Sequence, residues 1–243
     1  MTTLVAHLYR RLMKRSRVIW LILLASIPGL IFAVVGIDAE PGELEAVLGT
    51  VMVTVGFSYA IAALILTVST LRDERDAGTL PYLYMRPIPR LTIAMAAMLA
   101  GIMAAATIAV GGWLSTVLAG LMHGADMSVV LPGAVLLLAA ALGYAAVFVP
   151  LGYLFSRSVL VGLGYLILVE LVLAPLVAGL AQISVWQIAS SIYVDLLDTA
   201  GLEEAELLQA IDPGAGGGLI KLAVILLVGT GVLTWALRTR DAL

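Results

Sequence analysis

The chain has 243 residues, of which 62 % are hydrophobic and only 12 % charged, and its formal net charge is −3. A soluble domain carries about twice this charged fraction, so a water-soluble fold would leave much apolar surface without cover. The lack of cysteine excludes disulfides and thiolate metal sites, and because the two histidines lie far apart in sequence we expect no metal centre. The composition points to a protein whose solvent is the lipid bilayer.

The chain opens with an amphipathic segment. Residues 2–16 place Leu4, Val5, Leu8 and Leu12 at helical spacing, with arginines and a lysine between them. A helix of this kind buries its apolar side at the membrane surface and leaves its charges in water. We therefore expect residues 1–17 to form an interfacial helix whose basic residues contact membrane lipid.

Six apolar runs follow, each long enough to cross a bilayer as a helix, since a span needs roughly 20 mostly apolar residues. The runs are continuous and lack the alternation of a barrel strand, so helices are the expected spanning structure. The predicted fold class is an all-α polytopic membrane protein with six transmembrane helices, in which residues 1–243 form a single transmembrane domain. The runs cover residues 18–37, 46–71, 91–122, 129–155, 159–180 and 218–237.

A long connection, residues 181–217, separates the fifth and sixth spans. Its first part, 183–194, is apolar enough to dip back into the bilayer. Its second part, 202–210, combines acidic and apolar residues as a short amphipathic helix does. Prolines and glycines then predict a flexible entry to the last span. We expect this connection to form short helices on the outer side of the membrane.

Basic residues gather on one side of the six-span arrangement. Those within 10–17, those within 72–90, Arg157 and those within 238–240 all fall on this side, whereas acidic residues dominate the loops of the other side. Loops rich in Lys and Arg stay in the cytoplasm. We therefore expect a multi-pass protein of the cell (inner) membrane with both ends of the chain in the cytoplasm.

The cytoplasmic connection between the second and third spans, residues 72–90, carries the strongest local signals. Gly78 can take the left-handed conformation that ends a helix, and Thr79 is a good N-cap for a new one. Leu80 then begins a short stretch that Arg86 and Pro87 stop before the third span. These start and stop signals predict a short cytoplasmic helix that is rigidly framed at both ends, although a loop rich in Gly and Pro has the same composition.

The same connection resembles the signature of the type 2 family of ATP-binding-cassette (ABC) export permeases. In that family an acidic stretch precedes Gly-Thr-Leu, an Arg-Pro or similar pair, and a basic residue before the third span. Pro81 and Tyr82 depart from the pattern, because relatives more often carry polar or acidic residues there. The family's interfacial helix, six spans and short outer helices agree with the elements predicted above. The matching positions are Asp73, Glu74, Gly78, Thr79, Leu80, Arg86, Pro87 and Arg90.

The resemblance implies that residues 72–90 form a coupling helix seated in a cleft of a separate ABC ATPase subunit. Two permeases, as a homodimer or as a pair with a homologous permease, would work with two ATPases. ATP binding would switch the membrane cavity between inward and outward access. Glu74, Arg75 and Asp76 would contact the ATPase, and the corner at Gly78 and Thr79 would keep the lever stiff. We expect membrane lipid as a further partner and no nucleic acid.

The chain carries no phosphate-binding loop of its own. Such a loop needs Gly before its Lys and Ser or Thr after it, and neither Lys14 nor Lys221 has these neighbours. We therefore expect no catalytic residue, no metal ligand and no cofactor in this chain, with ATP and Mg²⁺ bound by the partner ATPase.

Glu170 is the one carboxylate inside a predicted span, near the middle of the fifth. An ionisable group at that depth is costly and functional by default, yet a carboxyl group bonded to a neighbouring helix also holds helices together. A place in the translocation path and a place in the packing of the bundle both stay open. Two other functions stay open as well, a proton-coupled secondary transporter that uses Glu170 and a non-transporting membrane scaffold or assembly protein.

Overall fold

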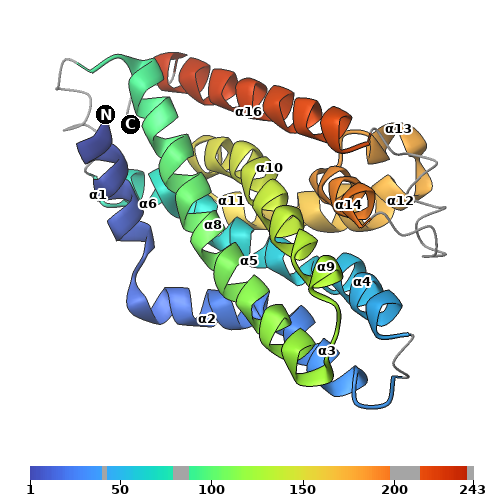
Figure 1. Ribbon diagram of the computed structural model, residues 1–243. Helices are drawn as coiled ribbons and strands as arrows, with labels where there is room; N and C mark the ends of the chain where they lie inside the picture. The colour runs from blue at the N-terminus through green and yellow to red at the C-terminus, as the bar shows by residue number, and fades with distance from the viewer. Residues whose placement is uncertain (40–42, 79–87, 198–213, 240–243) are drawn as a thin grey trace.

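We describe the protein from a computed structural model, which places residues 1–39, 43–78, 88–197 and 214–239. All regular elements of these described residues are helices, and the long ones pack side by side in one bundle (Figure 1). The expectation of an all-α polytopic membrane protein is confirmed. The predicted helices over 80–86 and 202–210 lie outside the described residues.

The first helix, α1 (Thr2–Leu12), has the expected amphipathic character. It packs on the long helix α8 and turns Val5, Leu8 and Leu12 inward. Its residues on the other sides, including Arg10, are exposed. The helix therefore joins the bundle along one edge and leaves its exposed side, with Arg10, for the membrane surface.

The first span is broken. α2 (Arg15–Ala25) and α3 (Ile27–Val35) meet at an angle of 40°, and together they are apolar enough to cross a membrane as one bent span. Pro28 stands in the first turn of α3. A residue without an amide hydrogen is tolerated there but cannot continue the hydrogen bonds of α2. The bend therefore lies where the predicted span 18–37 contains its proline.

The second, third and fourth spans form the centre of the bundle. α10 packs against α8, α16, α14 and α5, which makes it the central helix. The predicted third span, 91–122, differs from α8 by one residue at each end. The elements of these spans are α4 (Leu44–Thr54), α5 (Ser58–Thr67), α6 (Ser69–Asp76), α8 (Arg90–His123), α9 (Met127–Val130) and α10 (Pro132–Leu154).

The fifth span contains a π-helical stretch. α11 (Ser158–Tyr165) continues into the π-helix η1 (Leu166–Leu173) and then into α12 (Ala174–Leu176). A short helix, α13 (Ala178–Ala181), follows. The segment expected to dip back forms α14 (Val185–Leu196), which returns into the bundle and packs against α10 and α16. The last span is α16 (Gly214–Thr239).

The number of spans agrees with the prediction. Within the described residues, five helical runs are long and apolar enough to cross a membrane, and the bent pair α2 and α3 makes a sixth. α6 ends, α8 begins and α16 ends at the same end of the bundle (Figure 1). We call this the basic end, because the predicted basic loops gather there.

Small residues let the central helices approach closely. Gly101 of α8 faces α10, since a Cβ built on it would lie 2.8 Å from Cγ2 of Val149. Such packing is common in membranes, where small residues line helix contacts. α16 and α10 approach in the same way, since a Cβ built on Gly229 would lie 2.2 Å from the carbonyl oxygen of Ala146.

Replacing Gly229 with alanine is therefore expected to destabilise the bundle. The added methyl group would meet backbone atoms that have no other rotamer, and overpacking of this kind costs about 1–3 kcal/mol. Gly231→Ala is the matched control, two residues along the same helix, where an added Cβ has no neighbour within 4 Å. Thermal unfolding of the detergent-solubilised protein compares the two, and equal Tm values would contradict the close contact.

Candidate functional site

The charged residues of the predicted coupling segment begin at the end of α6. This helix continues the second span and carries only charged side chains in its last five positions. Ala77 closes the helix, and Gly78 follows with φ = +65° while its N–H donates to the carbonyl oxygen of Arg75 at 3.0 Å. The prediction that Gly78 ends this helix in the left-handed conformation is confirmed.

Glu74 points into the molecule, toward α1. The residue is only 7 % exposed, and its carboxylate lies 2.5 Å from Nη1 of Arg11 and 3.4 Å from Nε2 of His7. Arg11 also donates through Nη2 to the carbonyl oxygen of Asp73 at 2.8 Å. One arginine of α1 thus holds both a side chain and the backbone of α6, and contacts between charged groups are stronger than neutral hydrogen bonds.

Arg17, near the start of α2, holds α5 and α6 from another side. Its guanidinium donates to the carbonyl oxygen of Ile65 at 2.6 Å and to Oγ of Ser69. It also lies 3.6 Å from the carboxylate of Asp73. The first and second spans are therefore tied together at the basic end.

Arg75 ties α6 to the end of α10. Its Nη1 donates to the carbonyl oxygen of Tyr153 at 2.9 Å, and its Nη2 to that of Phe155 at 3.4 Å. Carbonyl groups at the end of a helix have no partner within it, and a cation there also interacts favourably with the helix dipole. Arg75 thus completes α10 and fixes it relative to α6.

These contacts bring together three of the predicted site residues and two residues that sequence reasoning missed. We call Arg11, Arg17, Asp73, Glu74 and Arg75 the α6 charge cluster. The signal for the missed pair was the basic stretch before the first span, which balances the acids at the end of the second. Sequence alone does not say which arginine meets which acid, because the packing of α1 and α2 decides it.

The other predicted coupling residues lie beyond this cluster. Asp76 has a side chain that is 53 % exposed and pairs with Arg72 at 3.3 Å, one turn earlier in the same helix. Arg90 is the first residue of α8 and is half-buried. The remaining four lie outside the described residues, and their roles stay predictions: Thr79, Leu80, Arg86 and Pro87.

Glu170 lies in the π-helix η1 and is held at the start of α14. Its carboxylate accepts hydrogen bonds from the hydroxyl of Tyr165 at 2.7 Å and from that of Ser184. It also accepts from the backbone N–H groups of Val185 at 3.0 Å and Trp186 at 3.2 Å. The first amides of a helix have no partner within it, and the helix dipole favours an anion there.

This arrangement suits a carboxylate that only accepts hydrogen bonds. Glu170 is 5 % exposed, and four donors surround it. Ser184 accepts in turn from the N–H of Gln187, as an N-cap residue does. The contacts support the packing alternative for Glu170, because they fasten α14 to the fifth span and leave the carboxylate little access to a cargo.

A comparison with known families extends these observations. The sequence model described as "ABC-2 family transporter protein" matches residues 13–174, well over half of the chain. The chain belongs to this family. It is therefore a membrane permease subunit, and the resemblance of the 72–90 connection is confirmed at the level of the family. No curated protein matches the chain significantly.

The matched region contains both sites described above. It runs from just before α2 to the end of η1, so it includes the whole α6 charge cluster except Arg11, and it includes Glu170. The start of α14, which holds Glu170, follows the matched region. Membership of the ABC-2 family implies association with an ABC ATPase. The segment expected to contact the ATPase is 72–90, and the structure describes its beginning, the exposed end of α6.

Removing the Arg75 side chain is expected to destabilise the protein more than removing that of Arg72. Arg75→Ala removes the hydrogen bonds to the carbonyl oxygens of Tyr153, in the last turn of α10, and of Phe155 just after it. Hydrogen bonds to a charged group are worth about 1.5–3 kcal/mol. Arg72→Ala removes only the pair with Asp76 in the same helix, worth about 0.3–0.5 kcal/mol. Thermal unfolding in detergent measures both, and equal stability of the two variants would contradict the anchoring role of Arg75.

Glu170→Gln is expected to loosen α14. The amide presents N–H groups of its own to the surrounding donors, so at least one donor loses its acceptor, at a cost of about 1–3 kcal/mol. The matched control is Glu43→Gln, an exposed position just before α4, where we expect a change within about 0.5 kcal/mol. Thermal unfolding curves of the two variants measure this difference. A Glu170→Gln protein as stable as wild type would show that Glu170 does not hold α14 in place.

Proposed function

We propose that this chain is the membrane-spanning subunit of an ATP-driven exporter and that a separate ABC ATPase subunit supplies the energy. The observation that carries the proposal is the α6 charge cluster, which joins the start of the coupling segment to three other helices. Family membership and the distribution of basic loops support the same function. In this arrangement both ends of the chain are cytoplasmic, and the basic end of the bundle faces the ATPase.

A lever transmits a displacement only if its base is rigid. Asp76 and Gly78 stand at the exposed end of α6, while Glu74 and Arg75, just before them, are fixed to α1 and α10. A movement imposed on the segment after Gly78 would therefore reach α10, the central helix. ATP and Mg²⁺ would bind in the ATPase. Two copies of this chain, or this chain and a homologous permease, would enclose the path.

Asp76 is the acid that we assign to the contact with the ATPase. Its side chain is 53 % exposed, whereas that of Glu74 is 9 % exposed and faces α1. Glu74 would have to leave its buried ion pair with Arg11 to meet a partner, whereas the pairs of Asp76 with Arg72 and Arg75 lie at the surface, where ion pairs are weak and exchange easily. In this assignment Glu74 supports the lever, and Asp76 meets the partner.

The walls that this chain offers to a cargo are apolar. A cleft of about 470 Å³ between α10, α11 and α16 is lined by Pro150, Val161, Val228 and other apolar side chains, with Tyr165 among them. Cavities of this size suit small molecules. We assign the cargo to the class of apolar or amphipathic compounds, such as lipids, peptides or drug-like molecules.

The two other functions receive less support. A proton-coupled transporter would need Glu170 to meet its cargo or water during transport, and four donors already surround it. A non-transporting scaffold would bind an ATPase without cargo-stimulated ATP hydrolysis. The rigid base of α6 favours a transmitted movement over simple attachment.

Because the chain has no cysteine, a single introduced cysteine reports on one position. In membranes that also contain the partner ABC ATPase, we expect Asp76→Cys to give a covalent adduct with the ATPase on addition of a short cysteine-to-lysine crosslinker. Asp126→Cys is the matched control, an exposed aspartate just before α9 at the opposite end of α8. It should give no adduct.

No adduct from Asp76→Cys, or equal adducts from both positions, would contradict the proposal. The same variants test the orientation. A membrane-impermeant maleimide added to intact cells should label Asp126→Cys, whereas Asp76→Cys should react only after the cells are opened. Labelling of Asp76→Cys in intact cells would place the basic end outside the cell.

A further inference from the structure

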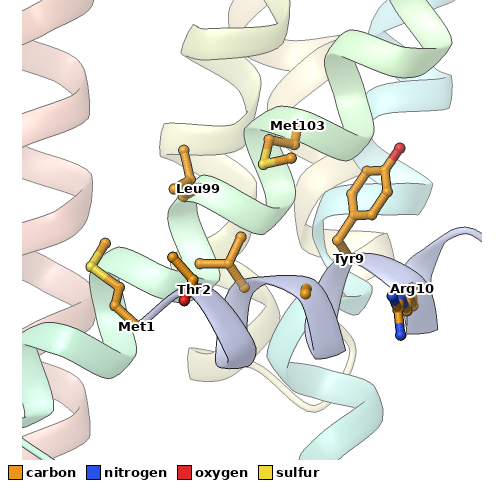
Figure 2. Close-up of a pocket in the computed structure, with 8 residues that line it drawn as sticks. Met1, Thr2, Tyr9, Arg10, Leu99 and Met103 are labelled. Carbon is orange, nitrogen blue, oxygen red and sulfur yellow. The ribbon is translucent and has the colours of Figure 1, made fainter.

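A cleft between α1 and α8 is lined by none of the residues of the α6 charge cluster. Its volume is about 470 Å³, and it is open to the surroundings. Figure 2 shows its walls, with Leu99 and Met103 of α8 on one side and α1 on the other, from Met1 to Tyr9. Ala6 lies between Met1 and Tyr9 along α1, and the lining of the cleft is almost wholly apolar. A soluble ligand would find few polar partners there.

The cleft exists because α1 touches α8 along one edge. Val5 and Leu8 bury in that contact, and Tyr9 holds one end of it, since its hydroxyl lies 3.0 Å from Oγ1 of Thr107. Leu99 and Met103 remain 41 % and 43 % exposed beside this contact. Large apolar side chains at the edge of a membrane protein are covered by hydrocarbon, and a lipid chain is the hydrocarbon available.

A positive charge stands at the rim of the same cleft. Arg10 lines it, next to Tyr9 in Figure 2, and forms no ion pair within the described part of the chain. Its neighbour Arg11 lies about 100° further round the helix and is bound to Glu74. Lys14 and Arg15 follow and are exposed. The two arginines of α1 therefore face different partners, one inside the protein and one at the cleft.

We propose that the cleft between α1 and α8 binds one anionic phospholipid. One of its two acyl chains lies along Leu99 and Met103, and its phosphate lies at Arg10. An anionic headgroup matches a basic rim, whereas the ammonium of a zwitterionic headgroup offsets the attraction of its own phosphate. The bound lipid holds α1 against α8 and thereby steadies Arg11, which supports α6. The site does not depend on whether an ATPase binds the chain.

Native mass spectrometry of the full, detergent-solubilised chain tests the proposal with phosphatidylglycerol and with phosphatidylcholine of the same acyl chains. We expect wild type to retain one phosphatidylglycerol more tightly than phosphatidylcholine. Arg10→Ala should weaken phosphatidylglycerol binding about fivefold, the effect of one interfacial cation, and remove the preference. Ala6→Trp fills the apolar cleft and should weaken the binding of both lipids.

Matched controls separate this site from general attraction to the membrane. Arg157→Ala removes an exposed arginine outside the cleft, and Thr3→Trp adds the same bulk to α1 at an exposed position that does not line it. Both should bind lipid as wild type does. Equal retention of the two lipids by wild type, or undiminished binding by Arg10→Ala and Ala6→Trp, overturns the proposal. Displacement of the lipid by excess glycerol phosphate overturns it too, because it would reveal a phosphate site.

Discussion

The ion pair between Arg11 and Glu74 is the contact on which the basic end of the protein depends. An acid buried where a membrane span ends needs a partner, because an unpaired charge in such a place is costly. Arg11 is that partner, and its second contact with the backbone of Asp73 makes α1 a part of the bundle instead of a separate surface helix. Arg75 extends the same arrangement to α10. Together with Arg17 of α2, these residues join α1, α2, α6 and α10 in one charged junction, at the place where the family's coupling segment begins.

A second polar anchor, at Glu170, holds a different part of the chain. The π-helix turns this carboxylate toward the first amides of α14, and Trp186 adds a hydrogen bond from its indole N–H to the carbonyl oxygen of Val53 at 2.9 Å. Short π-helical stretches within α-helices often mark functional positions. Close contacts such as that of Gly229 with Ala146 join α16 to the central helix α10.

Rules that depend only on neighbouring residues predicted where several helices begin, bend and end. Continuous apolar runs predicted α8 to within a residue at each end, Pro28 accounts for the break in the first span, and Gly78 ends α6 as its backbone freedom predicts. Contacts between residues far apart in the sequence could not be predicted in this way. The family resemblance implied that Glu74 contacts a partner subunit, and sequence alone gave no sign that Arg11 of the basic first helix pairs with it. The donors to Glu170 lie in a segment whose apolar composition indicated only that it would return to the bilayer.

The most direct test of this account asks whether Arg75 carries motion from α6 to α10. A spin label at Arg157→Cys, just after α10, reports the distance between the two permease copies in the purified complex with the ATPase. We predict that this distance changes when a non-hydrolysable ATP analogue binds, that Arg75→Ala abolishes the change, and that Arg72→Ala preserves it. A change that persists undiminished in Arg75→Ala would contradict the account, as would a label that does not respond to the nucleotide in the unmutated background.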